Sequence, residues 1–155
     1  MCLMCRNPEM TQADYDASMR EIVDETGWAI QLVERDRRHA AFAYTIGLEE
    51  IGHPELLVTG LPQRAAGELL NTVAHGVAHH GERPVPGERR RVKDRWLEIV
   101  EVDVPSAHLL TAVRLVGPDV RALQLVYTDD RSRWPWHVGF RGRQPVLGSP
   151  VELGR

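Results

Sequence analysis

The order of helical and strand-like segments limits the folds that this chain can adopt. Apolar residues recur at helical spacing over three segments, which are residues 11–27, 62–80 and 105–117. Alternating or continuous apolar runs predict strands at residues 28–32, 42–46, 55–59, 92–104 and 123–127, followed by a last ordered segment at residues 134–140. Residues 82–91 are rich in Pro, Gly and Arg and are expected to form a surface loop. A doubly wound fold needs strict alternation of strand and helix, which this order lacks. We therefore expect an α+β fold, with a mixed, mostly antiparallel sheet of about five to six strands and two to three helices packed mainly on one face.

One continuous apolar run marks the middle of the expected sheet. Leu56-Leu57-Val58 contains no polar residue, which is typical of a strand that is covered on both faces. Trp28–Leu32 and Phe42–Ile46, which precede it, alternate in polarity and predict an antiparallel hairpin. Pro62 then stands at the first-turn position of a long helix, where proline is well tolerated. We expect Glu55–Thr59 to be a central strand.

The length of 155 residues predicts a single domain over residues 1–155. Within it, residues 1–10 are expected to form an irregular head that contains both cysteines, and residues 144–155 a tail. A chain of this size buries roughly 70% of the surface that its unfolded form exposes. The fold therefore needs neither a disulfide nor a metal to be stable.

Composition and charge narrow the compartment and the partners. The net charge of −3 and the pI of about 6.2 do not favour nucleic-acid binding. The chain contains no run of 18 apolar residues, so a transmembrane helix is not expected, and the first ten residues lack the apolar core of a signal peptide. We expect a cytoplasmic protein with a small-molecule or protein partner. The sequence leaves its oligomeric state open, a homodimer included.

The Cys2-x-x-Cys5 spacing has three interpretations. It could form a redox dithiol, provide two ligands of a zinc site, or have no function beyond packing. A structural zinc usually takes four ligands, and the chain has no second cysteine pair. Zinc at Cys2 and Cys5 would therefore need histidines or the cysteines of a second subunit.

The long predicted helix carries three histidines near its end. His75 and His79 are four residues apart and therefore share one face, as a metal-binding pair must. The apolar stripe of this helix centres on Val73 and Val77, on the opposite side. We therefore expect His75 and His79 to be surface residues, and His80 to point toward the core.

A loop between two predicted strands is the first candidate binding site. Tyr44 and Thr45 stand near its entry, and His53 and Glu55 near its exit. These side chains could bind a small polar ligand or supply general acid–base groups. The alternative is an architectural loop, shaped by its glycines and proline, in which His53 hydrogen-bonds a backbone carbonyl.

The second candidate is the segment that contains Trp134, Trp136 and His137. Residues two apart on an extended segment face the same way, so the two indoles could form one aromatic wall. Such a wall suits a planar ligand or a partner surface, and it suits a buried core corner equally well. We expect this segment to lie beside the His53 loop, with both lining the main concave site.

Several common chemistries have no motif in this chain. A glycine-rich phosphate loop, a His-Glu-x-x-His zinc motif, a Gly-x-Ser-x-Gly elbow and a dinucleotide fingerprint are all absent from the sequence. Nucleotide-driven and serine-hydrolase chemistry is therefore disfavoured.

Taken together, several short motifs resemble one bacterial family. They are Met1-Cys2-Leu3-Met4-Cys5, Tyr44-Thr45-Ile46-Gly47-Leu48, Gly52-His53-Pro54-Glu55-Leu56, Thr59-Gly60-Leu61-Pro62, Ala122-Leu123-Gln124-Leu125-Val126 and Trp134-Pro135-Trp136. The chain resembles the family known as domain of unknown function 4262, frequent in actinobacteria. Members often carry an acidic residue or a histidine just after the second cysteine, where this chain has Arg6-Asn7-Pro8. The resemblance implies a single domain of bacterial origin and no particular activity.

Three functional hypotheses follow from these residues. The first is an accessory domain that binds a small molecule or a protein through the Tyr44–Glu55 loop and the Trp134–His137 segment. The second is a small enzyme, a hydrolase or a metal-assisted one, that uses His53 and Glu55 with a metal at Cys2 and Cys5. The third is a protein-interaction or antitoxin-like module. A concave pocket with convergent polar groups would favour the first two, and a flat apolar patch the third.

Overall fold

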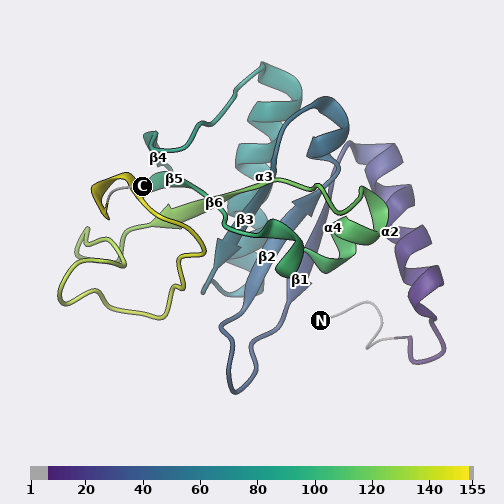
Figure 1. Ribbon diagram of the computed structural model, residues 1–155, viewed down its shortest axis with the longest axis horizontal. Coiled ribbons are helices and arrows are strands. Elements are labelled where there is room, and N and C mark those ends of the chain that lie inside the picture. The colour runs from purple at the N-terminus through teal and green to yellow at the C-terminus, as the bar shows by residue number, and fades with distance from the viewer. Residues whose placement is uncertain (1–6, 154–155) are drawn as a thin grey trace.

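A computed structural model describes residues 7–153, and in it six strands form one mixed sheet in the order β1-β2-β3-β6-β5-β4 (Figure 1). The strands are β1 (Ala29–Val33), β2 (Phe42–Ile46), β3 (Glu55–Thr59), β4 (Arg89–Val92), β5 (Arg95–Glu101) and β6 (Ala122–Tyr127). β3 and β6 pair in parallel, and every other neighbouring pair is antiparallel. The expected α+β fold and its mixed sheet are confirmed, as are the β1–β2 hairpin and the central place of β3.

Among residues 7–153, three α-helices accompany the sheet: α2 (Gln12–Thr26), α3 (Gln63–His80) and α4 (Leu110–Leu115). α2 begins with a capping box, in which the Thr11 hydroxyl accepts from the Asp14 N–H and the Asp14 carboxylate accepts from the Thr11 N–H, both at 3.1 Å. It ends at Gly27, whose φ of +101° requires glycine. None of the helices in the described part of the chain has the length and apolar character that a membrane crossing needs.

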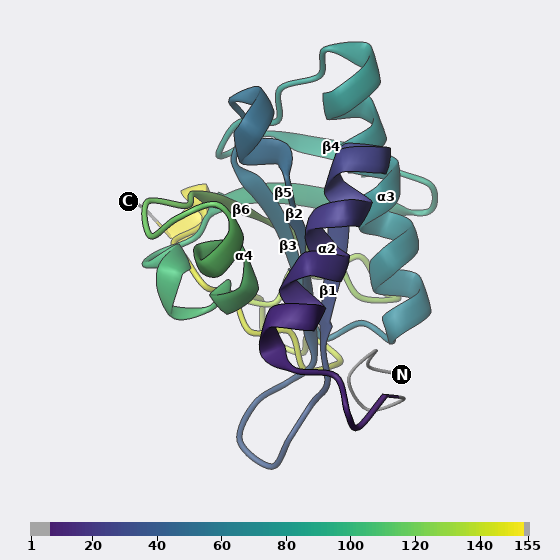
Figure 2. The ribbon, with the colours of Figure 1, turned by 90° about the vertical axis from the view of Figure 1, so that its right-hand side faces the viewer.

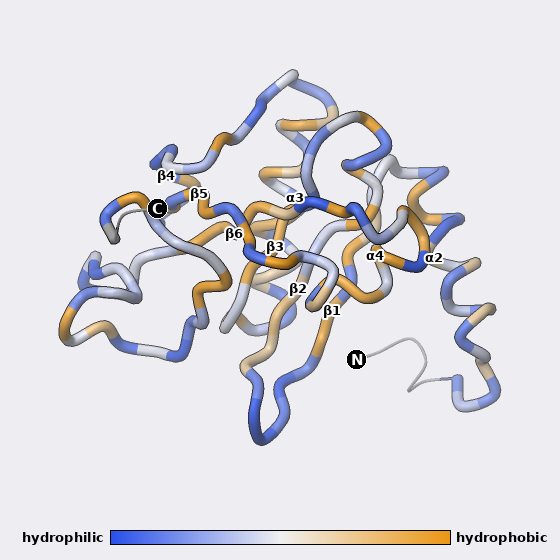
Figure 3. The backbone as a smooth tube through the Cα atoms, viewed as in Figure 1, coloured by the Kyte–Doolittle hydropathy of each residue, from blue (hydrophilic) through white to orange (hydrophobic). Residues whose placement is uncertain are grey.

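The strand expected at residues 92–104 is β5 (Arg95–Glu101), whereas β4 (Arg89–Val92) lies largely in residues 82–91, which are expected as a surface loop. β4 and β5 pair around a turn at Lys93, which has a φ of +55°. The charged pair Lys93-Asp94 forms this turn, within the segment expected as strand. Figure 3 shows a comparable hydrophilic turn between β1 and β2.

The helices cover both faces of the sheet, which differs from the expected packing mainly on one face. α3 packs against Leu56 and Val58 of β3, whereas α2 and α4 pack on the face that carries Leu57. Figure 2 shows α3 and α4 on opposite sides of the sheet. This packing explains why the middle of β3 is apolar without interruption: each face of the strand contacts a separate core.

The C-terminal segment covers the remaining part of the second face, over β5 and β6. Trp134 packs against Val100 and Val126. Farther along, the Gln144 side chain accepts from the Tyr127 N–H at 3.0 Å and donates to the Tyr127 carbonyl at 2.9 Å. Gln124 of β6 also donates to the Pro145 carbonyl at 2.8 Å and accepts from the Leu147 N–H at 2.7 Å. Residues 144–148, which belong to the segment expected as a tail, therefore form a strap that is hydrogen-bonded to the sheet.

Candidate ligand-binding site

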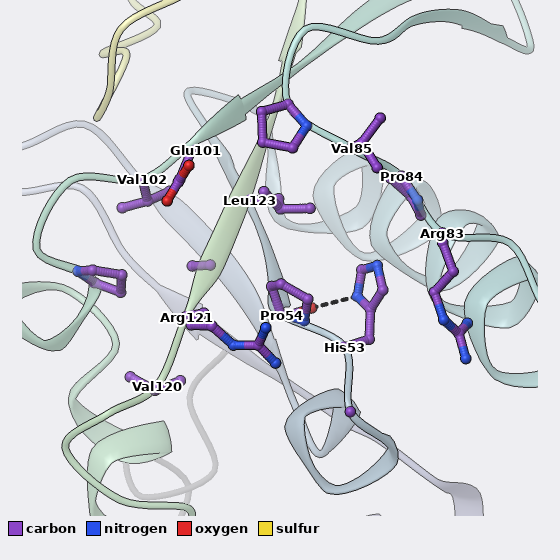
Figure 4. A pocket seen from close by; sticks show the side chains of 14 residues that line it. His53, Pro54, Arg83, Pro84, Val85, Glu101, Val102, Val120, Arg121 and Leu123 are labelled. Carbon is purple, nitrogen blue, oxygen red and sulfur yellow. Dashed lines mark hydrogen bonds between the residues drawn. The ribbon is translucent and has the colours of Figure 1, made fainter. Parts of the chain in front are cut away.

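A cavity of about 460 Å³ opens at the end of the sheet where the inner strands β3 and β6 begin and β5 ends (Figure 4). Loops after α3 and β5 complete its walls. Most of the lining is apolar, and four prolines contribute to it. The lining residues are Gly52, His53, Pro54, Arg83, Pro84, Val85, Pro86, Glu101, Val102, Pro105, Val120, Arg121, Ala122 and Leu123.

His53 is the buried polar side chain of this cavity. It is 2% exposed, and its Nδ1 lies 2.7 Å from the carbonyl oxygen of Pro54. Its Nε2 is buried and has no hydrogen-bond partner among the described residues. Burial lowers the pKa of His53, against the effect of the Pro54 hydrogen bond. The ring is therefore neutral at pH 7, with its proton on Nδ1 and a free acceptor lone pair on Nε2.

Two arginines and one glutamate bring charge to the cavity wall. Arg121 is neutralised by Glu49, whose carboxylate oxygens lie 3.0 and 3.2 Å from Arg121 Nε and Nη2. Arg83 donates through Nη1 to the carbonyls of Val77 and Glu82, at 3.1 and 2.8 Å, and forms no ion pair with the described residues. Glu101 is exposed and likewise forms no ion pair within residues 7–153. Figure 4 shows Arg83 on the His53 side of the cavity and Glu101 across from it.

Glu55 lies next in sequence to this turn but does not line the cavity. Its side chain is fully buried, and its carboxylate accepts from the Thr45 hydroxyl at 2.8 Å and from the N–H groups of Gly47, Leu48 and Glu49 at 2.9, 3.1 and 3.2 Å. Burial raises the pKa of Glu55 to about 7, although all four donors act to lower it. Glu55 thus holds the turn before His53 in place and does not form an acid–base pair with it.

The other two candidates from the loop entry are also structural. The Thr45 hydroxyl donates to Glu55 and accepts from the Leu56 N–H at 2.9 Å, so it links two strands to the turn. Tyr44 is buried on the α4 side of the sheet, where its hydroxyl accepts from the Thr111 N–H at 3.0 Å. Neither side chain reaches the cavity.

The tryptophan segment lies at a separate place, so the expectation of one shared site is wrong. Trp134 and Trp136 stack with ring centroids 5.4 Å apart and an interplanar angle of 1°, and the Arg89 guanidinium lies 4.7 Å from the Trp134 centroid. His137 Nε2 lies 2.9 Å from the Glu152 carboxylate, which also accepts from Trp136 Nε1.

Strand direction explains this separation. β6 runs parallel to β3, so its first residue, Ala122, pairs with Glu55 beside the cavity. The tryptophans follow the last residue of β6, Tyr127, at the opposite end of the strand. Trp134 lines a different hollow there, together with Arg89 and Trp96.

A family model described as a domain of unknown function, DUF4262, matches residues 22–141. The chain belongs to the DUF4262 family. No curated protein and no solved structure matches it. Every residue that lines the cavity lies within the span that matches DUF4262, whereas Cys2, Cys5 and Glu152 lie outside it.

The metal hypotheses gain no support from this DUF4262 structure. Cys2 and Cys5 lie outside the described residues. Within residues 7–153, no group of three or more histidine, cysteine, aspartate or glutamate side chains could hold a metal ion. His75 and His79 are exposed, as the helical phase predicts, but His80 is exposed too, and its expected orientation toward the core is wrong.

Sequence reasoning found His53 and missed the cationic side of its cavity. Arg83 follows α3 in a proline-containing loop that the sequence identifies only as surface loop, and Arg121 precedes β6. Neither belongs to a local motif of this DUF4262 chain. The sequence offers one indication that Arg83 has a defined position: Pro84 and Pro86 predict a fixed backbone path next to it.

Proposed function

We propose that this DUF4262 protein binds a small organic molecule in the cavity beside His53. The observation that carries the proposal is the buried Nε2 of His53, which no described residue satisfies. A buried polar atom without a partner costs about 1–3 kcal/mol. A ligand with an O–H or N–H donor would recover that free energy on binding.

The shape and lining of the cavity also suit a small ligand. Its volume of about 460 Å³ lies within the range of roughly 300–1,000 Å³ that is typical of small-molecule sites. The walls are mostly apolar with a few polar groups, which is the usual composition of such sites. Prolines fix the backbone on several sides, so little ordering would be needed on binding.

The enzyme alternative has no comparable support. It required Glu55 to act together with His53, and the Glu55 carboxylate is instead occupied by four donors of the fold. No serine, threonine or cysteine is among the described residues that line the cavity. Binding is therefore the function that the arrangement favours over nucleophilic catalysis.

Amide and histidine-ring NMR spectra of the ¹⁵N-labelled protein, recorded during titration with small hydroxylated aromatic and aliphatic fragments, test the proposal. We expect shift changes at the His53 ring and at the amides of Ala122 and Leu123. His53→Phe removes the acceptor and should abolish them, whereas His53→Gln supplies a carbonyl acceptor and should retain part of the binding. His39→Phe, at an exposed histidine, is the matched control.

Two results would overturn the proposal. One is binding of the same fragments to wild type and to a folded His53→Phe variant with equal affinity. The other is a set of shift changes that leaves the cavity residues unaffected at saturating fragment concentration. The amide spectrum of each variant shows directly whether its fold is intact.

A further inference from the structure

We infer that the ligand of this cavity is a small hydroxy acid: one carboxylate held by Arg83, an adjacent hydroxyl donated to His53, and an apolar body against the proline-rich wall. The inference rests on the proposed binding function and adds the chemical class of the ligand.

Arg83 provides the carboxylate contact. Its Nη1 is fixed by two backbone carbonyls, those of Val77 and Glu82. Its Nε and Nη2 have no partner among the described residues, and together they form the edge of the guanidinium that binds a carboxylate through two parallel hydrogen bonds. The end of α3 thus positions the Arg83 guanidinium, while its Nε–Nη2 edge stays available for a ligand.

His53 provides the second contact and selects a donor. Because the Pro54 carbonyl fixes the ring proton on Nδ1, Nε2 can only accept, and a carboxylate oxygen cannot serve it. In Figure 4 the His53 ring lies on the same side of the cavity as Arg83. A ligand that carries a hydroxyl on the carbon beside its carboxylate would satisfy both residues at once: the carboxylate would accept from Arg83, and the hydroxyl would donate to His53.

The remaining charges limit the ligand to one negative group. Glu49 neutralises Arg121, which leaves Arg83 as the uncompensated cation of the described lining. Glu101 across the cavity would repel a second anionic group on the far end of a ligand. A phosphate ester or a dicarboxylate therefore fits the charges less well than a monocarboxylate.

Three matched probes separate the contacts. Mandelate carries the carboxylate, the hydroxyl and an apolar ring, phenylacetate lacks the hydroxyl, and mandelamide lacks the charge. Leucic acid, isocaproate and leucic amide form the same series on an aliphatic body. Dissociation constants are measured by amide shift titration with wild type, Arg83→Gln, Arg83→Lys and the control Arg64→Gln, at an exposed arginine near the start of α3.

We expect the hydroxy acid to bind about tenfold or more tightly than its amide, as a charge-assisted contact implies. Arg83→Gln should remove that preference, Arg83→Lys should keep only part of it because lysine retains the charge but not the two parallel donors, and Arg64→Gln should keep all of it. Thermal unfolding of Arg83→Gln monitors the loss of its contact with the end of α3.

The outcomes distinguish the two proposals. Equal binding of acid and amide that still depends on His53 would overturn the hydroxy-acid inference and leave the binding function intact. A preference for phenyl phosphate over mandelate, or equal binding of phenylacetate and mandelate, would also overturn it. If neither series binds at the cavity, both proposals fail together.

Discussion

The buried carboxylate of Glu55 makes a specific prediction about the pH dependence of stability. Burial raises its pKa in the folded protein from the usual 4.5 to about 7, so the folded state binds the proton more tightly than the unfolded chain. The stability contributed by protonated Glu55 is fully present below pH 4.5 and is lost as the pH rises through 7. The shift corresponds to about 3 kcal/mol of free energy of unfolding.

The measurement compares wild type with Glu55→Gln, which cannot titrate. Urea unfolding, followed by tryptophan fluorescence, gives the free energy of unfolding of both proteins from pH 4.5 to above 7. The stability of wild type relative to Glu55→Gln should fall by about 3 kcal/mol over this range, because other titrating groups cancel in the difference. In the control Glu50→Gln the difference from wild type should stay nearly constant over this range, because the hydrogen bond from Arg20 lowers the pKa of Glu50 and the stability linked to it is lost only as the pH falls below 4.5.

A constant or rising difference between wild type and Glu55→Gln would refute the reasoning about burial. It would mean that the four donors around the carboxylate outweigh its desolvation and keep it ionised at all these pH values. The experiment thus decides which of two opposing effects controls this buried group.

Three further variants test other parts of the structure. Thr45→Val leaves the Leu56 N–H without its acceptor and should lower the free energy of unfolding by about 1–3 kcal/mol, measured by urea unfolding; a loss below about 0.5 kcal/mol would contradict the link. His75→Gln with His79→Gln should change it by about 0.5 kcal/mol or less, and a larger effect in thermal unfolding would show that these exposed rings are structural. Gly148→Ala places a Cβ 1.9 Å from a backbone carbonyl oxygen of β5 and should displace the strap, which amide hydrogen exchange of β5 and β6 would detect as faster exchange; unchanged protection would argue against a closely packed strap.

The elements with strong local patterns could be predicted from the sequence. The alternation in β1 and β2, the continuous apolar run of β3, and the apolar stripe of α3 each follow from contacts that one element makes with a core. The turn at Lys93 could not, because two charged residues within a strand-like segment are compatible with either an exposed strand or a reversal.

Strand order decided which candidate residues meet, and local pattern carries no information on strand order. The parallel pairing of β3 with β6 places Ala122 beside the His53 turn and carries Trp134 away from it. The same long-range pairing brings Arg121 to the cavity from a position far along the chain. His53 could be selected as a candidate from its place in a glycine- and proline-containing loop, but its neighbours in space could not.

Three consecutive residues at the cavity show how one short motif combines structural and binding roles. Glu55 gathers the preceding turn through its four donors, so the backbone that carries His53 is fixed. The Pro54 carbonyl then accepts from the His53 ring and determines which nitrogen carries the proton. The consequence is an imidazole whose orientation and protonation are both set by its neighbours, with one lone pair left over. A fold that needed His53 only for packing would gain by replacing it with an apolar residue, because the unpartnered Nε2 costs free energy and contributes nothing to the core. The same cost becomes a source of affinity once a donor from a ligand occupies the cavity.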